Sequence, residues 1–196
     1  MDFLKRHGWW IAILVFVGAM LVNGMNTIPT QDEKVKAAWS QVENQYQRRM
    51  DLVPNLVNTV KGYADFEQKT LTAVIDARAN ATKVTISADI INNPETMKKF
   101  EQTQGALESA LSRLLAVSEN YPNLKANQQF MALQSQLEGT ENGIASARRD
   151  YIEAVQDYNT IVRTFPGVVW ARVYGVSAKQ TFTATAGAEQ APVVKF

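Results

Sequence analysis

Hydrophobic and polar positions divide the chain into an uncharged N-terminal run and a longer body of amphipathic segments. Residues 8–25 carry no charged side chain, and as a helix they would reach roughly 27 Å, close to the hydrocarbon thickness of a bilayer. From residue 31 onward, apolar residues recur at spacings of three and four with charged residues between them, which is typical of packed amphipathic helices. The pattern predicts an all-α fold: an N-terminal transmembrane helix, then an elongated antiparallel, coiled-coil-like bundle of three to four helices.

The uncharged run fits a retained anchor better than a cleaved signal peptide. Its apolar core, residues 9–22, is short enough for a signal peptide, but Asn23-Gly24-Met25-Asn26 follows in place of a small-residue cleavage site. Trp9 and Trp10 stand where interfacial aromatic residues hold a spanning helix. We therefore expect membrane attachment through this segment.

The flanking charges predict the orientation of that anchor. Lys5 and Arg6 precede the run, and the positive-inside tendency places them in the cytoplasm. The body then lies on the outer side of the cell (inner) membrane, periplasmic or extracellular, in a single-pass protein. The predicted division is residues 1–7 as cytoplasmic N-terminus, 8–25 as transmembrane anchor, 26–167 as helical bundle and 168–196 as C-terminal tail.

Prolines and caps mark the expected helices. Pro29 is expected to separate the anchor from a first bundle helix over 33–81, which bends at Pro54. A connecting segment follows, and a second helix over 94–119 begins after the capping residue Asn93. A third helix over 127–165 ends before Pro166-Gly167. An apolar stretch over 168–174 and a weakly ordered tail complete the chain.

These helix lengths do not match one another. At 1.5 Å per residue they reach roughly 74, 39 and 59 Å, so a simple bundle leaves part of a long helix uncovered. We expect either a protruding two-helix end or a partner that covers it.

The composition argues against several classes of catalytic and binding site, but it does not identify a function. The formal charge is +1, with 20 basic and 19 acidic residues and no basic patch, so nucleic acid is not an expected partner. The chain has no cysteine, and its one histidine, His7, lies in the N-terminal flank. The body thus lacks thiolate chemistry and a histidine base or ligand. Phosphate-binding loops and nucleophile elbows are also absent. We predict no enzyme, no catalytic residue, no cofactor and no metal site.

Polar residues within the helical seams are the candidates for chemistry. Glu67, Arg78, Glu141 and Arg148 occupy seam positions, where buried charges need partners. A polar layer that sets helix register is the favoured interpretation, and a ligand or proton-handling site is the alternative. Four tyrosines share the seam spacing and are expected in the core: Tyr46, Tyr63, Tyr151 and Tyr158. Trp170 and Tyr174 follow the last long helix, and we expect them to contact the membrane, a partner or the end of the bundle.

Several stretches resemble the LemA family, in the right order and over nearly the whole chain. They are Arg49-Met50-Asp51-Leu52-Val53-Pro54-Asn55-Leu56-Val57, Val60-Lys61-Gly62-Tyr63-Ala64, Tyr121-Pro122-Asn123-Leu124-Lys125-Ala126, Glu141-Asn142, Ala147-Arg148-Arg149, Asp157-Tyr158-Asn159, Phe165-Pro166-Gly167 and Gly187-Ala188-Glu189-Gln190-Ala191-Pro192. Departures from the family pattern are Phe66 in place of a frequent histidine, Ile152 in place of a common asparagine, and the helix-weakening Gly139 and Gly143.

The resemblance implies a bacterial membrane protein with one N-terminal span and an antiparallel helical bundle outside. The family has no established catalytic residues; gene neighbourhoods with membrane proteases and relatives in magnetosome membranes suggest a scaffold or adaptor. The leading hypothesis is a non-enzymatic envelope protein that presents its bundle to a membrane or periplasmic partner, or to itself. The alternatives are a small-molecule-binding or enzymatic bundle using a buried Glu/Arg/Tyr layer, and a lipid-binding protein with a role in membrane remodelling or stress sensing.

Overall fold

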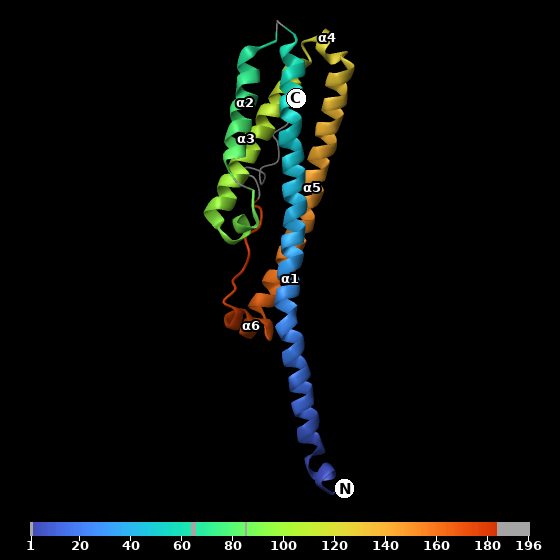
Figure 1. The fold of residues 1–196 in the computed structure, drawn as a ribbon, viewed down its shortest axis with the longest axis vertical. Helices are drawn as coiled ribbons and strands as arrows, with labels where there is room; N and C mark the ends of the chain where they lie inside the picture. Colours follow the sequence, from blue (N-terminus) through green and yellow to red (C-terminus); the bar gives the residue numbers. More distant parts are fainter. Residues whose placement is uncertain (1, 64–65, 85, 184–196) are drawn as a thin grey trace, which may run out of the picture.

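The computed structural model describes residues 2–63, 66–84 and 86–183, and of residues 2–6, 8, 17 and 19–23 it describes the backbone alone. All regular secondary structure in these ranges is helical (Figure 1). The elements are α1 (Asp2–Lys61), α2 (Gln68–Lys83), the 3-10 helix η1 (Ala88–Asn92), α3 (Pro94–Ser118), α4 (Pro122–Lys125), α5 (Gln128–Arg163) and α6 (Gly167–Tyr174).

The four long helices alternate in direction. α1 runs the length of the molecule, α2 returns beside it, α3 runs back along α2, and α5 returns along α1 (Figure 1). The closest pairings are α1 with α5 and α2 with α3. The predicted all-α, antiparallel bundle is confirmed.

The expected continuous helix over 33–81 is wrong, because the chain reverses between α1 and α2. Helix α1 ends at Lys61, directly before Gly62, a weak helix former. The apolar spacing continues from Val60 through Tyr63 to Leu71 and Val74, so periodicity alone did not reveal the reversal. Both arms of the resulting hairpin place these residues against the same core.

The predicted helix boundaries at Asn93-Pro94 and before Pro166-Gly167 are confirmed, whereas the predicted break at Pro29 is wrong. The Asn93 side chain accepts hydrogen bonds from the backbone N–H groups of Glu95 and Thr96 at the start of α3, as predicted. Pro29, however, does not separate two elements, since α1 is continuous through it and through Pro54. A proline removes one backbone hydrogen bond, and the remaining backbone hydrogen bonds on either side keep the helix continuous.

The predicted anchor over 8–25 falls in the N-terminal part of α1. Among the residues that the structure describes, no helix has the length and apolarity that crossing a membrane requires. Several side chains of the predicted span lie outside the described set. The anchor therefore stays a prediction.

The bundle contains two cores, one on each side of a buried arginine. The core nearer α4 is aliphatic and joins α1, α2, α3 and α5; we call it the aliphatic core, and it includes Leu56, Leu71, Leu107, Leu114 and Phe130. The core nearer α6 is the aromatic core, and it includes Trp39, Phe100, Tyr151, Tyr158 and Phe182. Of the four seam tyrosines, Tyr46, Tyr151 and Tyr158 are buried as expected, and Tyr63 is half-buried.

The C-terminal residues fold back onto the bundle and cover the excess length of α1 and α5. Residues 176–183 form an extended segment, which we call the strap, although the sequence pattern indicated a weakly ordered tail there. Asn159 brackets Lys179, accepting from its backbone N–H at 2.8 Å and donating to its carbonyl at 3.0 Å. Tyr151 donates to the Gln180 carbonyl at 2.6 Å. Residues 184–196 lie outside the described residues.

Phe182 fixes the end of the strap in the aromatic core. Its ring stacks on Trp39, with centroids 6.0 Å apart, and meets Tyr151 edge to face. Beyond it, Thr183 donates from both its N–H and its hydroxyl to the Glu101 carboxylate. The expected protruding two-helix end is therefore covered in part by the chain itself.

Candidate functional site

A fully buried arginine joins three helices at the boundary between the two cores. The guanidinium of Arg49 on α1 donates from Nη1 to both carboxylate oxygens of Glu141 on α5, at 3.1 and 3.2 Å. Its Nη2 donates to the side-chain oxygen of Gln104 on α3 at 2.7 Å and to the Gln104 carbonyl at 3.3 Å. The guanidinium carbon also lies 4.9 Å from the Tyr46 ring centroid. We call Arg49, Gln104 and Glu141 the polar cluster.

The polar cluster is incompletely satisfied. Arg49 Nε and Gln104 Nε2 are buried and have no hydrogen-bond partner, and an unmet buried donor costs free energy. Burial raises the pKa of the Tyr46 hydroxyl, although the positive charges of Arg148 and Arg49 oppose that shift. A cluster of this kind fixes register better than it stabilises.

The four predicted seam charges do not form one layer. Glu141 is paired, but with Arg49, which the seam analysis did not include. Arg78 donates from Nε to the Met50 carbonyl at 3.0 Å, and Glu67 accepts from the Thr70 hydroxyl. Arg148 lies over the Phe182 ring, 4.2 Å from its centroid. Of the four charges, only Glu141 therefore belongs to the polar cluster.

Sequence spacing contained the missing signal. The apolar steps pass from Tyr46 to Val53, and Arg49 stands three residues after the first and four before the second. Gln104 holds the equivalent place between Phe100 and Leu107. A polar residue in a skipped seam position on each of two helices, like Glu141 on a third, marks each of the three as a candidate for a buried polar contact.

A groove lies between α3 and α5 beside the polar cluster, and we call it the α3–α5 groove. Its leucine section has a volume of about 390 Å³ and is floored by Leu111, Leu115 and Leu137. Three carboxylates line the same section: Glu108 from α3, and Glu138 and Glu141 from α5. The groove therefore combines an apolar floor with an acidic edge.

The second section of the α3–α5 groove continues from Glu108 toward the strap. It measures about 460 Å³, and its lining includes Gln104, Tyr46, Arg148 and Thr183. Cationic and anionic side chains are mixed here, because Lys98 and Arg148 line this section together with Glu101 and Glu108. The strap reaches the groove through Thr183, so the chain's own C-terminal segment lines one end of it.

The groove is lined by apolar and charged side chains. Within the described ranges, no group of three or more His, Asp or Glu side chains is placed to hold a metal ion. The charged side chains of the leucine section are carboxylates alone, which attract cationic groups. An apolar floor flanked by charge is the arrangement that receives an amphipathic helix.

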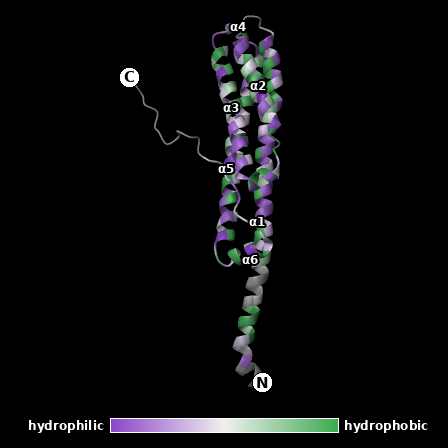
Figure 2. Ribbon diagram, turned by 90° about the vertical axis from the view of Figure 1, so that its left-hand side faces the viewer, coloured by the Kyte–Doolittle hydropathy of each residue, from purple (hydrophilic) through white to green (hydrophobic). Residues whose placement is uncertain are grey.

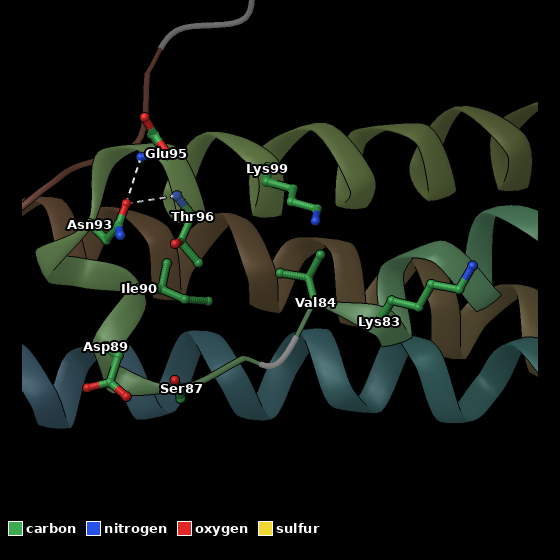
Figure 3. Close-up of a pocket in the computed structure, with 9 residues that line it drawn as sticks. All are labelled: Lys83, Val84, Ser87, Asp89, Ile90, Asn93, Glu95, Thr96 and Lys99. Carbon is green, nitrogen blue, oxygen red and sulfur yellow. Dashed lines mark hydrogen bonds between the residues drawn. The ribbon is translucent and has the colours of Figure 1, made fainter.

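A further hollow of about 480 Å³ lies where α2, η1 and α3 meet, and Figure 3 shows the residues around it. Val84 and Ile90 contribute apolar surface, and exposed Lys83 and Lys99 stand at its sides. Asn93 lies at its edge with its oxygen bonded to the first turn of α3. Asn93, the polar residue at the edge of this hollow, caps α3, and we take the α3–α5 groove as the candidate site.

The chain is an elongated antiparallel helical bundle with a buried arginine and a groove between α3 and α5. The family of the chain follows from comparison with known proteins. A model of the LemA family matches residues 38–196, and the chain belongs to that family. The resemblance found in the sequence motifs is confirmed.

Curated relatives are distant but extend along most of the chain. Magnetosome protein MamQ 2 of Paramagnetospirillum magneticum is 25% identical over 188 residues, covering 88% of this chain and 69% of the relative. Magnetosome protein MamQ of Magnetospirillum gryphiswaldense is 23% identical with the same coverage. Protein LemA of Metamycoplasma hominis is 23% identical over 155 residues, covering 79% of this chain and 65% of the relative.

Proposed function

We propose that this chain is a membrane-anchored, non-enzymatic interaction protein of the bacterial cell envelope, whose α3–α5 groove receives an amphipathic helix of a partner protein or of a second copy. The groove carries the proposal: its Leu111, Leu115 and Leu137 floor lies beside the carboxylates of Glu108, Glu138 and Glu141. The fitting partner helix has an apolar face flanked by lysine or arginine.

The anchor belongs to the proposal on sequence grounds. Residues 8–25 are uncharged, and Lys5 and Arg6 precede them, which favours a cytoplasmic N-terminus and a bundle on the outer side of the inner membrane. Attachment would keep the groove within one bundle length of the bilayer. Relatives named magnetosome proteins are compatible with a role in an assembled structure.

Photo-crosslinking in intact cells tests the groove directly. A photoreactive amino acid at Ser112, an exposed residue of the leucine section, should yield one discrete adduct. The same group at exposed Thr72 on α2 serves as the control position. An adduct of twice the chain mass indicates a second copy, and any other discrete mass indicates a different protein.

Charge reversal makes the test specific. Glu108→Lys with Glu138→Lys should abolish the Ser112 adduct, because a cationic partner would meet like charge. The matched control is Glu153→Lys with Asp157→Lys, two exposed carboxylates of α5 outside the groove, which changes the net charge equally. The proposal fails if Ser112 gives no adduct, or if both variant pairs reduce it alike.

A second candidate function, binding of a small molecule, rests on one observation. Gln104 Nε2 is a buried donor without a partner, and Gln104 lines the section that also holds Arg148 and Tyr46. A ligand with an acceptor group would satisfy that donor. Native mass spectrometry of the full chain in detergent should then show a bound mass that Gln104→Leu removes. A bare chain mass under gentle release would contradict this candidate.

A further inference from the structure

Helix α6 exposes an apolar stripe that nothing in the described chain covers. Val169 is 49% exposed and Val173 is 67% exposed, and Phe165, one turn before them, is 76% exposed. The spacing of four places the two valines on one helix face, with Phe165 just before it. The opposite face is already used, because Gly167 and Ala171 are buried against the bundle. Such a stripe on a monomer marks an interaction surface.

Two contacts fix the position of this stripe along α1. Trp170 lies against Gly24, where a Cβ atom would come within 2.3 Å of the indole Nε1, so only glycine allows this approach. The Tyr174 hydroxyl donates to the Met25 carbonyl at 3.0 Å. Gly24 and Met25 are the last residues of the predicted anchor over 8–25, and the polar residues Asn26 and Thr27 follow them. Helix α6 therefore lies beside α1 at the level where the predicted anchor ends (Figures 1 and 2).

The charges around the stripe are of one sign. Helix α6 has no acidic residue, and Arg172 on it and Arg163 at the end of α5 are exposed. Apolar side chains flanked by arginine, with tryptophan and tyrosine at the same level, are typical of helices that lie in a bilayer interface. Anionic lipid headgroups complement the two arginines.

We infer that α6 is a second membrane contact, lying on the surface of the outer leaflet with Phe165, Val169 and Val173 in the lipid and Arg163 and Arg172 at the headgroups. This inference rests on the proposed anchor, because α1 sets the depth at which α6 meets the bilayer. The consequence is mechanical. One helix alone lets the bundle tilt, whereas two contacts at the same depth hold it at a defined angle.

Lipid-borne quenchers test the inference on the full chain. The natural sequence has no cysteine, so Val173→Cys provides a single site for an environment-sensitive fluorophore, and Met131→Cys provides an exposed control near the far end of the bundle. The labelled proteins are reconstituted into vesicles of phosphatidylethanolamine and phosphatidylglycerol that contain nitroxide lipids. The Val173 label should lose most of its emission, and the Met131 label should keep it.

Removing the three apolar side chains tests whether they cause the quenching. In a chain labelled at Ser177→Cys, the substitutions Phe165→Ser, Val169→Ser and Val173→Ser should reduce quenching by lipid nitroxides. The control removes three exposed apolar residues elsewhere, through Ile75→Ser, Met131→Ser and Ile152→Ser, and should leave it unchanged. All six positions are exposed, so both variants retain the core.

The outcomes separate this inference from the anchor. Failure of the protein to float with vesicles overturns the anchor, and the inference falls with it. Flotation without quenching at position 173 overturns the inference alone. Loss of emission that depends on protein concentration and not on nitroxide means that a second copy covers the stripe, which also overturns it.

Discussion

The two halves of the bundle bury their cores with different secondary-structure elements and different side chains. Near α4, four antiparallel helices enclose the aliphatic core, and every helix contributes side chains at regular spacing. Near α6, α2 is absent, and η1, the strap and α6 take its place around the aromatic core. The polar cluster of Arg49, Gln104 and Glu141 lies between them.

The difference shows what large rings contribute where helices are missing. An irregular strap offers few side chains, so each one must bury much area, as Phe182 does between Trp39 and Tyr151. Its backbone polar groups need partners as well, and Asn159, Tyr151 and Glu101 supply them from helices. The strap is thus held by a few contacts with large side chains, whereas the helices of the aliphatic half pack along regularly spaced residues.

Removing the arginine between the halves should have the largest effect. Arg49→Ala empties the space of a fully buried side chain and leaves the buried Gln104 side-chain oxygen without its donor, and it is expected to lower the free energy of unfolding by about 4 kcal/mol. Chemical denaturation of the full chain in detergent measures this. Replacing the whole cluster through Arg49→Met, Gln104→Leu and Glu141→Leu should restore most of the loss, because no buried polar group is then left unpaired. A cost below about 1 kcal/mol for Arg49→Ala would contradict the boundary role.

Equivalent truncations in the two cores should differ in kind. Leu114→Ala is expected to cost about 3 kcal/mol and to weaken the whole bundle, because Leu114 is fully buried among four helices. Phe182→Ala should cost about 2 kcal/mol, since the strap can detach without the helices unfolding. Hydrogen exchange measures the contrast: Phe182→Ala should expose the amides of 176–183 selectively. Equal protection losses along α1 in both variants would remove the distinction.

Acid should loosen the strap through Asp32. Partial burial raises the pKa of Asp32, but hydrogen bonds from Lys179 and Lys36 outweigh it and hold that pKa below its ordinary value. The Lys179 ammonium lies 2.6 Å from the carboxylate. Because the folded-state pKa is depressed, the stabilisation is present above the ordinary aspartate pKa of about 4 and is lost as the pH falls through the folded value.

Asp32→Asn provides the measurement for that pH dependence. At pH 7 the free energy of unfolding of this variant should be about 1 kcal/mol lower than that of the natural chain. The gap should close as the pH falls below the folded-state pKa of Asp32, because both chains then carry a neutral side chain. Glu33→Asn is the control, since Glu33 is exposed and pairs with Lys36, not with the strap residue Lys179. If the difference in the free energy of unfolding widens in acid, the pKa of Asp32 is not lowered in the folded state.

The smallest effect is expected at Arg148. This residue lies over the Phe182 ring and lines the groove, and it has no place in the polar cluster. Arg148→Met should therefore cost about 0.5 kcal/mol, the loss of one cation–π contact. Thermal unfolding beside Arg149→Met, an exposed neighbour, measures it. A cost of several kcal/mol would return Arg148 to the register role that its seam position suggested.

Local signals in the sequence predicted the helical part of the fold well. Amphipathic spacing indicated the long helices, and Asn93 and Asn127 cap α3 and α5 near the expected residues. A cap depends on groups within three residues of it, so it can be read from a short window. The reversal after Lys61 could not be read in this way, because the apolar spacing is the same in one long helix and in a hairpin that serves one core.

The candidate site was only half visible in the sequence. Glu141 was recognised as a seam charge, whereas its partner Arg49 and the third member Gln104 were not. Spacing shows which residues share a face of one helix, but it does not show which levels of different helices meet. That level was decided when α1, α3 and α5 packed together, and the groove between α3 and α5 followed from the same packing.

The sequence by itself determined helix type, caps, the uncharged N-terminal run and the absence of cysteine, because each depends on residue identity or short-range spacing. Tertiary structure alone decided the hairpin of α1 and α2, the partner of Glu141, and the return of residues 176–183 to Trp39 and Asn159. Those features join residues far apart in the chain, and their free energy exists only when several helices are already in place.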